Sequence, residues 1–228
     1  MSKKNYPGWE LKFFDNSKNF RLYQLQLINK HLSGHLAEVG PGNGISLSYY
    51  INKPHRIDLF EPSKKHYIKL KKKFKKNSKI KIFNRSLSGK KKYDTIIYLD
   101  VLEHIKKDNQ EVKKALKLLK KKGKLIINVP AFAHLYSDFD KDVGHYKRYS
   151  KSDFKKILKN SNTMKITYKY YDSIGYILSI MSKLFIKNYK SNFENKIKLW
   201  NNLIFLSKLI DKVILNSLGK SLLIIIEK

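Results

Sequence analysis

Hydrophobic and polar positions follow two different periods along the chain. Short apolar runs predict strands at residues 35–40, 56–62, 79–84, 93–100, 124–130, 165–171 and 221–228. The stretches between them predict helices at residues 9–32, 45–51, 63–76, 108–123 and 151–160. Because strands and helices alternate, we expect an α/β fold with a mostly parallel sheet covered on both faces.

Several of these elements have recognisable ends. Asp108 stands where it can cap the 108–123 helix, and Gly123 is placed to end it. Pro130 stops the strand that follows, and Ser150 is placed to cap the next helix. A polar loop is expected between these last two residues.

Residues 172–219 interrupt the alternation, because two apolar helices stand between the last two strands. Both helices mix wide apolar faces with scattered lysines. They are expected either to cap the core or form a lid, or to lie as a basic amphipathic pair on an anionic membrane. Within one domain, residues 1–228, we therefore expect an N-terminal helical segment (1–34), a core (35–171), a helical insert (172–219) and a last strand (220–228).

The composition narrows the chemistry and the location. The 228 residues include no cysteine, which excludes disulfides, thiolate metal sites and a cysteine nucleophile. No uninterrupted apolar run reaches the about 18 residues that indicate a membrane span. Residues 1–14 lack the apolar core of a signal peptide. The cytoplasm is the expected location, with peripheral membrane contact through residues 172–219 as an open alternative.

The formal net charge of +31 would favour a nucleic-acid partner. Only four of the 49 cationic residues are arginines, so lysine supplies the other 45. Arginine is the side chain best suited to phosphate and base recognition, and this chain barely uses it. Lysine, asparagine, isoleucine and tyrosine share A/T-rich codons, so we attribute most of the charge to genome composition. An anionic membrane and a nucleic acid stay open as partners, and nucleic acid is not favoured.

The segment EVGPGNGI carries the first candidate site. Gly40, Gly42 and Gly44 follow a predicted strand and precede a predicted helix, the context of a nucleotide-binding loop. Gly42 would let the backbone approach a ligand without an intervening Cβ. The dinucleotide-binding fingerprint needs a third glycine where this chain has Ile45. Glu38, just before the loop, suits an ammonium group better than a pyrophosphate.

A second candidate, Glu61, ends the next strand, 17 residues after Gly44. A carboxylate at this place can accept hydrogen bonds from both hydroxyls of a ribose. The alternative is an acid that stabilises the start of a helix, because Pro62 and Ser63 follow it.

The segments AEVGPGNG, LFEP and YDTIIYLDVLEHI, in this order and spacing, resemble the class I S-adenosylmethionine-dependent methyltransferases. The resemblance covers about residues 35–160, and residues 221–228 match the last, antiparallel strand of the family. It implies a Rossmann-like, doubly wound, mostly parallel seven-stranded sheet with an antiparallel last strand and a helical insert before it. It also implies S-adenosylmethionine as the cofactor.

The same resemblance assigns the cofactor-binding residues. Glu38 and the Gly40, Gly42 and Gly44 loop would hold the methionine end, and Glu61 would hold the ribose. Ser86 and Leu87 would flank the adenine, although the family often has an acid there and this chain does not. Asp100 and Val101 would line the site beneath the methionine, together with His104. For His104 the alternative is packing at a strand–helix junction, and Glu103 is expected to be structural.

The loop at residues 130–154 is the expected acceptor side. Its segment DKDVGHYKRYS resembles a methyltransferase subgroup with a D-x-x-x-G-H-x-R-R-Y pattern, in which the loop overlies the methyl group. The candidates for catalysis are His145 first, then His104, with Asp142; the candidates for substrate binding are Asp140, Arg148 and Tyr149. An imidazole titrates near neutral pH, which suits a general base. The alternative is an ordered loop in which Asp140 and Arg148 pair. No complete set of metal ligands is evident, so no metal is expected.

The favoured hypothesis is methyl transfer from S-adenosylmethionine to an oxygen or nitrogen of a small molecule or a glycan or lipid-linked intermediate, by a monomer or homodimer. The alternative is an RNA methyltransferase acting on ribose or base. An NAD-dependent oxidoreductase is less favoured, because Ile45 replaces the third glycine. A binding module without activity is disfavoured by the intact acids and glycines.

Overall fold

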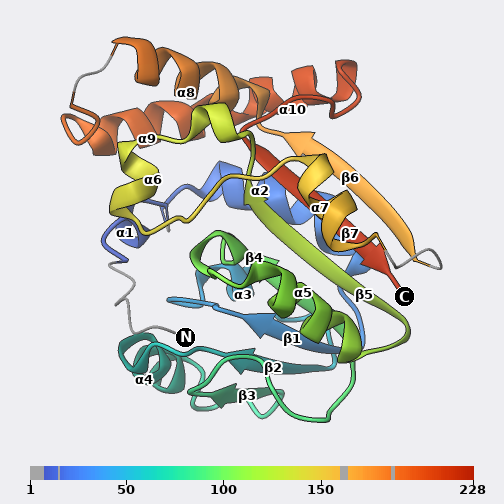
Figure 1. The fold of residues 1–228 in the computed structure, drawn as a ribbon. Helices are drawn as coiled ribbons and strands as arrows, with labels where there is room; N and C mark the ends of the chain where they lie inside the picture. The colour runs from blue at the N-terminus through green and yellow to red at the C-terminus, as the bar shows by residue number, and fades with distance from the viewer. Residues whose placement is uncertain (1–7, 15, 160–163, 186–187) are drawn as a thin grey trace.

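The computed structural model describes residues 8–14, 16–159, 164–185 and 188–228. Within these residues seven strands form one sheet in the order β3-β2-β1-β4-β5-β7-β6 (Figure 1). The strands are β1 (His35–Val39), β2 (Arg56–Phe60), β3 (Ile80–Phe83), β4 (Tyr93–Leu99), β5 (Leu119–Pro130), β6 (Lys165–Tyr171) and β7 (Ser221–Glu227). Only β7 runs antiparallel to its neighbours, β5 and β6. The predicted α/β fold with an antiparallel last strand is confirmed.

The described helices are α1 (Leu11–Phe14), α2 (Lys18–Ile28), α3 (Ile45–Tyr50), α4 (Lys64–Lys73), α5 (Asp108–Lys117), α6 (Asp138–Asp142), α7 (Lys151–Ile157), α8 (Ser173–Phe185), α9 (Phe193–Asn202) and α10 (Ile204–Val213). Short 3-10 turns lie at Asn29–His31 (η1), Leu102–His104 (η2) and Ala133–Leu135 (η3). Residues 1–7 of the predicted N-terminal segment, Asp15 within the predicted 9–32 helix and Asn160 at the end of another lie outside the described residues.

Two apolar layers lie on the two faces of the sheet. On one face α5 and α7 cover the strands, and Val112, Ala115 and Phe154 are buried there. On the other face α2, α3, α4 and the insert helices pack, and Ile28 and Leu47 are buried there. Because β1 lies between β2 and β4 and under both layers, all five of its residues are buried.

The boundary between α5 and β5 differs from the prediction. The helix ends at Lys117 and does not reach Gly123, which lies in β5. The Lys122 amide donates to the Lys228 carbonyl, and the Lys228 amide donates back to the Gly123 carbonyl. Through these bonds the lysine-rich segment pairs as a strand with residues at the far end of the sequence. A local sequence pattern does not show such a partner.

Two other predicted helical regions are divided. The 9–32 stretch contains α1, α2 and η1 among its described residues, and the described residues of the insert form three helices where two were expected. Leu203, the one residue between α9 and α10, has a helical backbone conformation, so the two helices follow each other almost without interruption. Ser150 caps α7 as predicted, through a capping box with Asp153.

Buried polar contacts attach the insert to the sheet. The Asp172 carboxylate accepts hydrogen bonds from Trp200 Nε1 at 2.8 Å and from Ser207 Oγ at 3.0 Å. The Asp211 carboxylate accepts from Tyr23 Oη of α2 at 2.7 Å and from the Asp172 amide. The insert is therefore part of the folded core. Of the helices in the described part of the chain, none combines the length and the apolarity needed to cross a membrane.

Candidate active site

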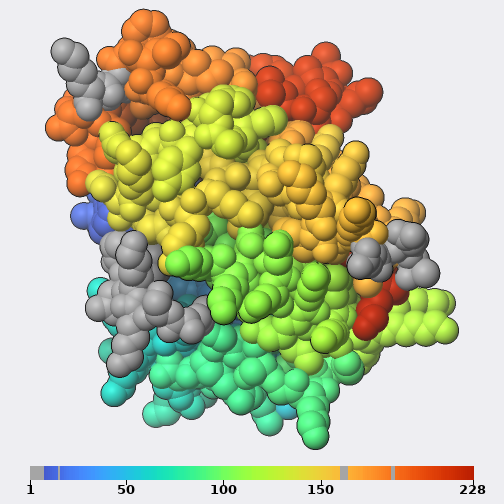
Figure 2. All heavy atoms as spheres, in the orientation of Figure 1, coloured from blue at the N-terminus to red at the C-terminus, as the bar shows by residue number. Residues whose placement is uncertain are grey.

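Most of the residues predicted to bind the cofactor lie where three neighbouring parallel strands end. The glycine loop follows β1, Glu61 follows β2 and Asp100 follows β4, and these strands are adjacent in the sheet. Ligands bind at this edge of open α/β sheets. Figure 2 shows blue atoms at the floor of a hollow just below the green segment around residues 100–110.

Two of the loop glycines are required by packing and one faces open space. A Cβ on Gly40 would lie 2.8 Å from Val101 Cγ2, and a Cβ on Gly44 would lie 2.6 Å from Leu70 Cδ2. A Cβ on Gly42 would meet only Leu11 Cδ1, at 3.6 Å. All three have φ near +60°, which glycine adopts without strain. Gly42 is therefore the position where backbone is open to a ligand.

Glu61 links the glycine loop to the start of α4. Its carboxylate accepts from the Gly42 amide at 3.1 Å and from the Ser63 amide at 2.8 Å. The side chain is buried, and burial raises its pKa. Each carboxylate oxygen has a second lone pair, so both can still accept from ribose hydroxyls. The two roles considered for Glu61, ribose ligand and helix-start acid, are therefore compatible.

Glu38 lies on β1 and is buried beside Tyr50. Tyr50 Oη donates a hydrogen bond to Glu38 Oε2. Burial raises the pKa of Glu38 to about 7, although the Tyr50 hydrogen bond and the charge of Arg21 lower it. A cationic group next to this carboxyl would favour its ionised form. The residue fits the ammonium group that the sequence predicts for this place.

The two residues predicted to flank adenine differ from each other. Ser86 is half-buried after β3, whereas Leu87 is fully buried in the apolar layer with Phe60 and Tyr98. The Leu87 side chain is therefore part of the core. An apolar residue that follows a strand can turn into the core, and a sequence motif does not show which way its side chain turns.

Asp100 is held in an unusual backbone conformation by a polar network. Its φ is +57°, which is uncommon for a residue with a side chain. Its carboxylate accepts from Asn128 Nδ2 at 2.6 Å, Arg21 Nη1 at 3.2 Å and Gln24 Nε2 at 3.4 Å. Tyr171 Oη donates to Asn128 Oδ1 at 2.8 Å. Asp100 thus ties the end of β4 to α2, and the following residue, Val101, covers Gly40.

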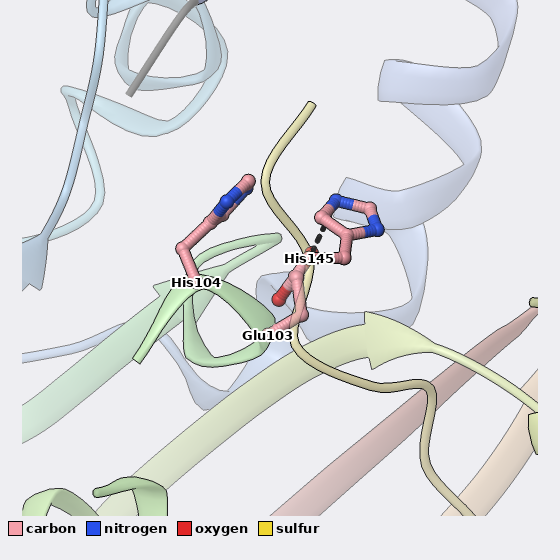
Figure 3. Close-up of side chains that lie close together, drawn as sticks. All are labelled: Glu103, His104 and His145. Atoms are coloured by element: carbon pink, nitrogen blue, oxygen red, sulfur yellow. Dashed lines mark ion pairs between the residues drawn. The ribbon is translucent and has the colours of Figure 1, made fainter. Parts of the chain in front are cut away.

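Glu103, His104 and His145 come together from two segments. Glu103 and His104 belong to η2, and His145 lies on the segment that crosses it (Figure 3). The rings of the two histidines meet edge to face, with centroids 4.7 Å apart. Burial, together with the charge of His145, lowers the pKa of His104 to about 3. Burial and the charge of Asp100 raise the pKa of Glu103 well above its usual value.

Asp140 orients His145 and also pairs with Arg148. His145 Nδ1 lies 2.7 Å from Asp140 Oδ1, and Arg148 Nε lies 3.0 Å from both Asp140 oxygens. Burial by itself would raise the pKa of Asp140, but the His145 hydrogen bond and the Arg148 charge outweigh it and lower the pKa. The alternative in which Asp140 and Arg148 pair is therefore what the structure shows.

The three predicted substrate-binding residues are all buried. Asp140 is completely inaccessible, and Arg148 is 7% exposed. Tyr149, 1% exposed, donates to Asp108 Oδ2 and to the Leu102 carbonyl. They support the loop that carries His145 and do not line an accessible surface. Asp108 is the first residue of α5 and not its N-cap, which is Lys107, although its Oδ1 accepts from the Asn109 amide at 2.7 Å.

Asp142, a predicted catalytic residue, does not join the histidines. Its carboxylate is ion-paired with Lys190 Nζ at 2.8 Å and accepts a hydrogen bond from Tyr189 Oη. Both partners belong to the segment between α8 and α9. Asp142 therefore connects α6 to the helical insert.

An aromatic cluster next to His145 is missing from the sequence predictions. It consists of half-buried rings from the N-terminal segment, α6 and α9, namely Trp9, Phe13, Phe14, Phe139 and Phe193. The Phe139 ring also meets the His145 ring, with centroids 6.3 Å apart. The only sequence signal is the aromatic density of residues 9–14, which a helix interior explains equally well.

Comparison with known proteins gives a family and a fold. Residues 15–166 match the family model described as a methyltransferase domain. Among curated proteins, no sequence matches the chain. The crystal structure of the YcgJ protein from Bacillus subtilis is 13% identical, covers 91% of this chain and 98% of its own, and has a TM-score of 0.61.

Two further similar structures are described as complexes with a bound ligand. Phosphoethanolamine N-methyltransferase 2 of Haemonchus contortus, in complex with S-adenosyl-L-methionine, is 12% identical, with a TM-score of 0.62 over 96% of this chain and 57% of that one. Coclaurine N-methyltransferase, bound to N-methylheliamine and SAH, is 15% identical, with a TM-score of 0.56 over 91% and 72%. The chain thus spans little more than half of the Haemonchus protein, and at these identities the likeness shows the fold alone.

Proposed function

The chain belongs to the methyltransferase-domain family, and from this premise we propose that it transfers a methyl group from S-adenosylmethionine to an oxygen or nitrogen of a small molecule or a glycan or lipid-linked intermediate. The observation that carries the proposal is the open backbone at Gly42, with its amide bonded to the buried carboxylate of Glu61. That pairing supports nucleoside binding, because the Glu61 carboxylate next to the open backbone could accept from ribose hydroxyls.

The names of the similar structures support the choice of cofactor. The Haemonchus protein is described in complex with S-adenosyl-L-methionine, and the coclaurine enzyme with SAH. In this chain, Glu38 offers a carboxyl for an ammonium group, and Glu61 offers two acceptor oxygens. A dinucleotide is disfavoured, because the third glycine of its fingerprint is Ile45.

S-adenosylmethionine would supply a methyl group on a positively charged sulfur. The protein then has mainly to align the acceptor with the donor, which can contribute about 7–11 kcal/mol. His145, fixed by Asp140, is our candidate for the residue that meets the acceptor. His145→Ala should slow methyl transfer and leave the affinity for S-adenosylmethionine unchanged; near-normal transfer by this variant would remove the role.

The surroundings of His145 favour an acceptor with an apolar part. Phe139 contacts the histidine ring, and the aromatic cluster continues from it towards Trp9. An RNA acceptor is the second candidate, favoured by the net charge of +31. Two of the four arginines, Arg21 and Arg148, are bonded to carboxylates inside the protein, which leaves few for phosphate recognition.

We also propose that the insert contacts an anionic membrane surface. Exposed apolar side chains recur on one side of α8 (Ile177, Met181 and Leu184) and on one side of α10 (Phe205, Leu209 and Val213). Lysines stand among them, as expected for binding to anionic lipid. An acceptor linked to a lipid would be presented at such a surface.

Calorimetric titration of the purified protein with S-adenosylmethionine and with NADH tests the cofactor. We expect saturable binding of S-adenosylmethionine only, and weaker binding by at least about tenfold in Gly42→Ala. Gly89→Ala is the matched control, because Gly89 also has a positive φ and a Cβ at this position would meet no atom within 4 Å. Binding of NADH in place of S-adenosylmethionine would refute the proposal.

A further inference from the structure

The Glu103, His104 and His145 cluster has the composition of a metal site. One ligand atom from each of the three residues lies within 4.8 Å of the other two. Ligands of one metal, bonded at about 2.0–2.2 Å, lie up to about 4 Å apart, so small side-chain rotations would bring all three into contact with a common ion. Neither segment carries a complete ligand set, which is why the sequence predicted no metal.

Glu103 has an unused acceptor inside the protein. Its side chain is 1% exposed, and its Oε2 atom has no hydrogen-bond partner among the described residues. Its Oε1 atom lies 3.9 Å from His145 Nε2, along the dashed line in Figure 3. A buried carboxylate oxygen without a donor is costly unless a ligand satisfies it. A cation between Glu103 and the histidines would do so.

The hydrogen bond from His145 to Asp140 provides an independent argument. Asp140 holds Nδ1 of the ring, at 2.7 Å, which leaves Nε2 as the nitrogen that faces Glu103. Histidines that bind metals commonly donate the other ring nitrogen to a carboxylate in this way, which fixes the ring and its tautomer. The Arg148 charge keeps Asp140 ionised for this role.

We propose that Glu103, His104 and His145 bind one divalent transition-metal ion, with Asp140 as the residue that positions His145. Two imidazoles and one carboxylate are the ligands of catalytic zinc and of ferrous sites with open positions, whereas Mg²⁺ and Ca²⁺ prefer oxygen ligands alone. Three protein ligands leave coordination positions for an exogenous group.

The place of the cluster relates it to the methyl acceptor. Glu103 follows Val101, which covers Gly40, by two residues, and His145 borders the aromatic cluster. A metal ion there would supply Lewis acidity to an acceptor hydroxyl, a consequence that rests on the proposed function. The binding of the metal itself does not depend on that function.

Titration of tag-free, chelator-stripped protein with Zn²⁺, and separately with Mg²⁺, tests the site by calorimetry and by metal analysis. We expect one Zn²⁺ per chain, and Mg²⁺ binding at least about a hundredfold weaker. Glu103→Gln and His145→Gln should each weaken Zn²⁺ binding by at least about tenfold. The matched control is His55→Gln, which removes an exposed histidine outside the cluster and should leave binding unchanged.

Thermal unfolding with and without Zn²⁺ shows whether each variant is folded. A variant that is folded but cannot bind Zn²⁺ should unfold cooperatively, and Zn²⁺ should not raise its melting temperature, because only a bound ion stabilises the folded state. Equal Zn²⁺ affinity in wild type and His145→Gln, or no saturable binding by wild type, would overturn the metal site. Titrating the same stripped protein with S-adenosylmethionine separates the two proposals, because loss of Zn²⁺ binding with retained cofactor binding refutes the metal alone.

Discussion

Arg21 and Arg148 show that single residues can carry information that the overall composition hides. Both are buried, and each meets a carboxylate, Asp100 or Asp140. In a chain with 45 lysines, an arginine at a buried position indicates a geometric requirement, because the planar guanidinium offers several fixed donors. Because arginine is scarce in this chain, its use at positions 21 and 148 is itself an indication of the ion pairs with Asp100 and Asp140.

Glu38 gives a pH prediction at the same scale. With its pKa at about 7 in the free protein, Glu38 is mostly neutral at pH 6 and mostly ionised at pH 8. Because an ammonium group favours the ionised form, affinity for S-adenosylmethionine should rise as the pH increases from about 6 to 8. Calorimetric titrations across this range measure the effect.

Two variants identify the titrating group. Glu38→Gln should flatten the dependence of affinity on pH. Tyr50→Phe should move the rise to higher pH, because it removes a hydrogen bond that lowers the pKa of Glu38. If Glu38→Gln keeps the wild-type pH profile, the assignment fails.

At the scale of elements, the segment between β5 and α7 is more ordered than its polar sequence indicates. A capping box between Ser137 and Asp140 starts α6, and the same Asp140 binds His145 and Arg148. The chain therefore uses one buried carboxylate to fix a helix end, a histidine and an arginine. The predicted loop is thus a hydrogen-bonded support for the candidate site.

Asp140→Ala tests this support. Removing one partner leaves Arg148 buried without its counter-charge, which should lower the free energy of unfolding by about 3–5 kcal/mol. Urea unfolding measures the loss. Asp142→Ala is the matched control two residues away, and its exposed ion pair with Lys190 should contribute too little to move the midpoint measurably. Similar midpoints for the two variants would contradict the role of Asp140.

At the scale of the whole molecule, the insert has two faces with different roles. Trp200, Ile204 and Asp211 are buried against α2 and the sheet, whereas Leu184, Phe185 and Val213 are at least 70% exposed. Deleting residues 172–219 would therefore remove part of the core as well as the outer surface. Figure 1 shows α8, α9 and α10 together at one end of the molecule.

Flotation with liposomes tests the outer face without disturbing the core. The protein should float with vesicles that contain phosphatidylserine and much less with phosphatidylcholine alone. The double variant Leu184→Ser and Phe185→Ser should lose most of this binding. Ile68→Ser is the control, because it removes another exposed apolar residue, from α4. Unchanged flotation by the double variant, or a shift in oligomeric state instead, would reject the membrane surface.

Local patterns determined much of the fold. The apolar runs predicted the seven strands of the sheet. The three glycines predicted the loop after β1, and the end of the next apolar run predicted the acid that follows β2. These features depend on neighbours within a few residues, because strand and turn preferences are local. The α5–β5 boundary could not be predicted, since Lys122 pairs with the C-terminal residue Lys228.

The sequence by itself predicted the family that the family model confirms and the order of the strands along the chain, and it offered Gly42 and Glu61 as candidates for binding a nucleoside. Only the tertiary structure decided which side chains meet. It placed Tyr50 on Glu38, buried Asp140 between His145 and Arg148, and brought Glu103 to within 3.9 Å of a histidine 42 positions further along the chain. Contacts of this kind depend on how the sheet brings distant loops to one edge, and no short-range pattern of residues encodes them.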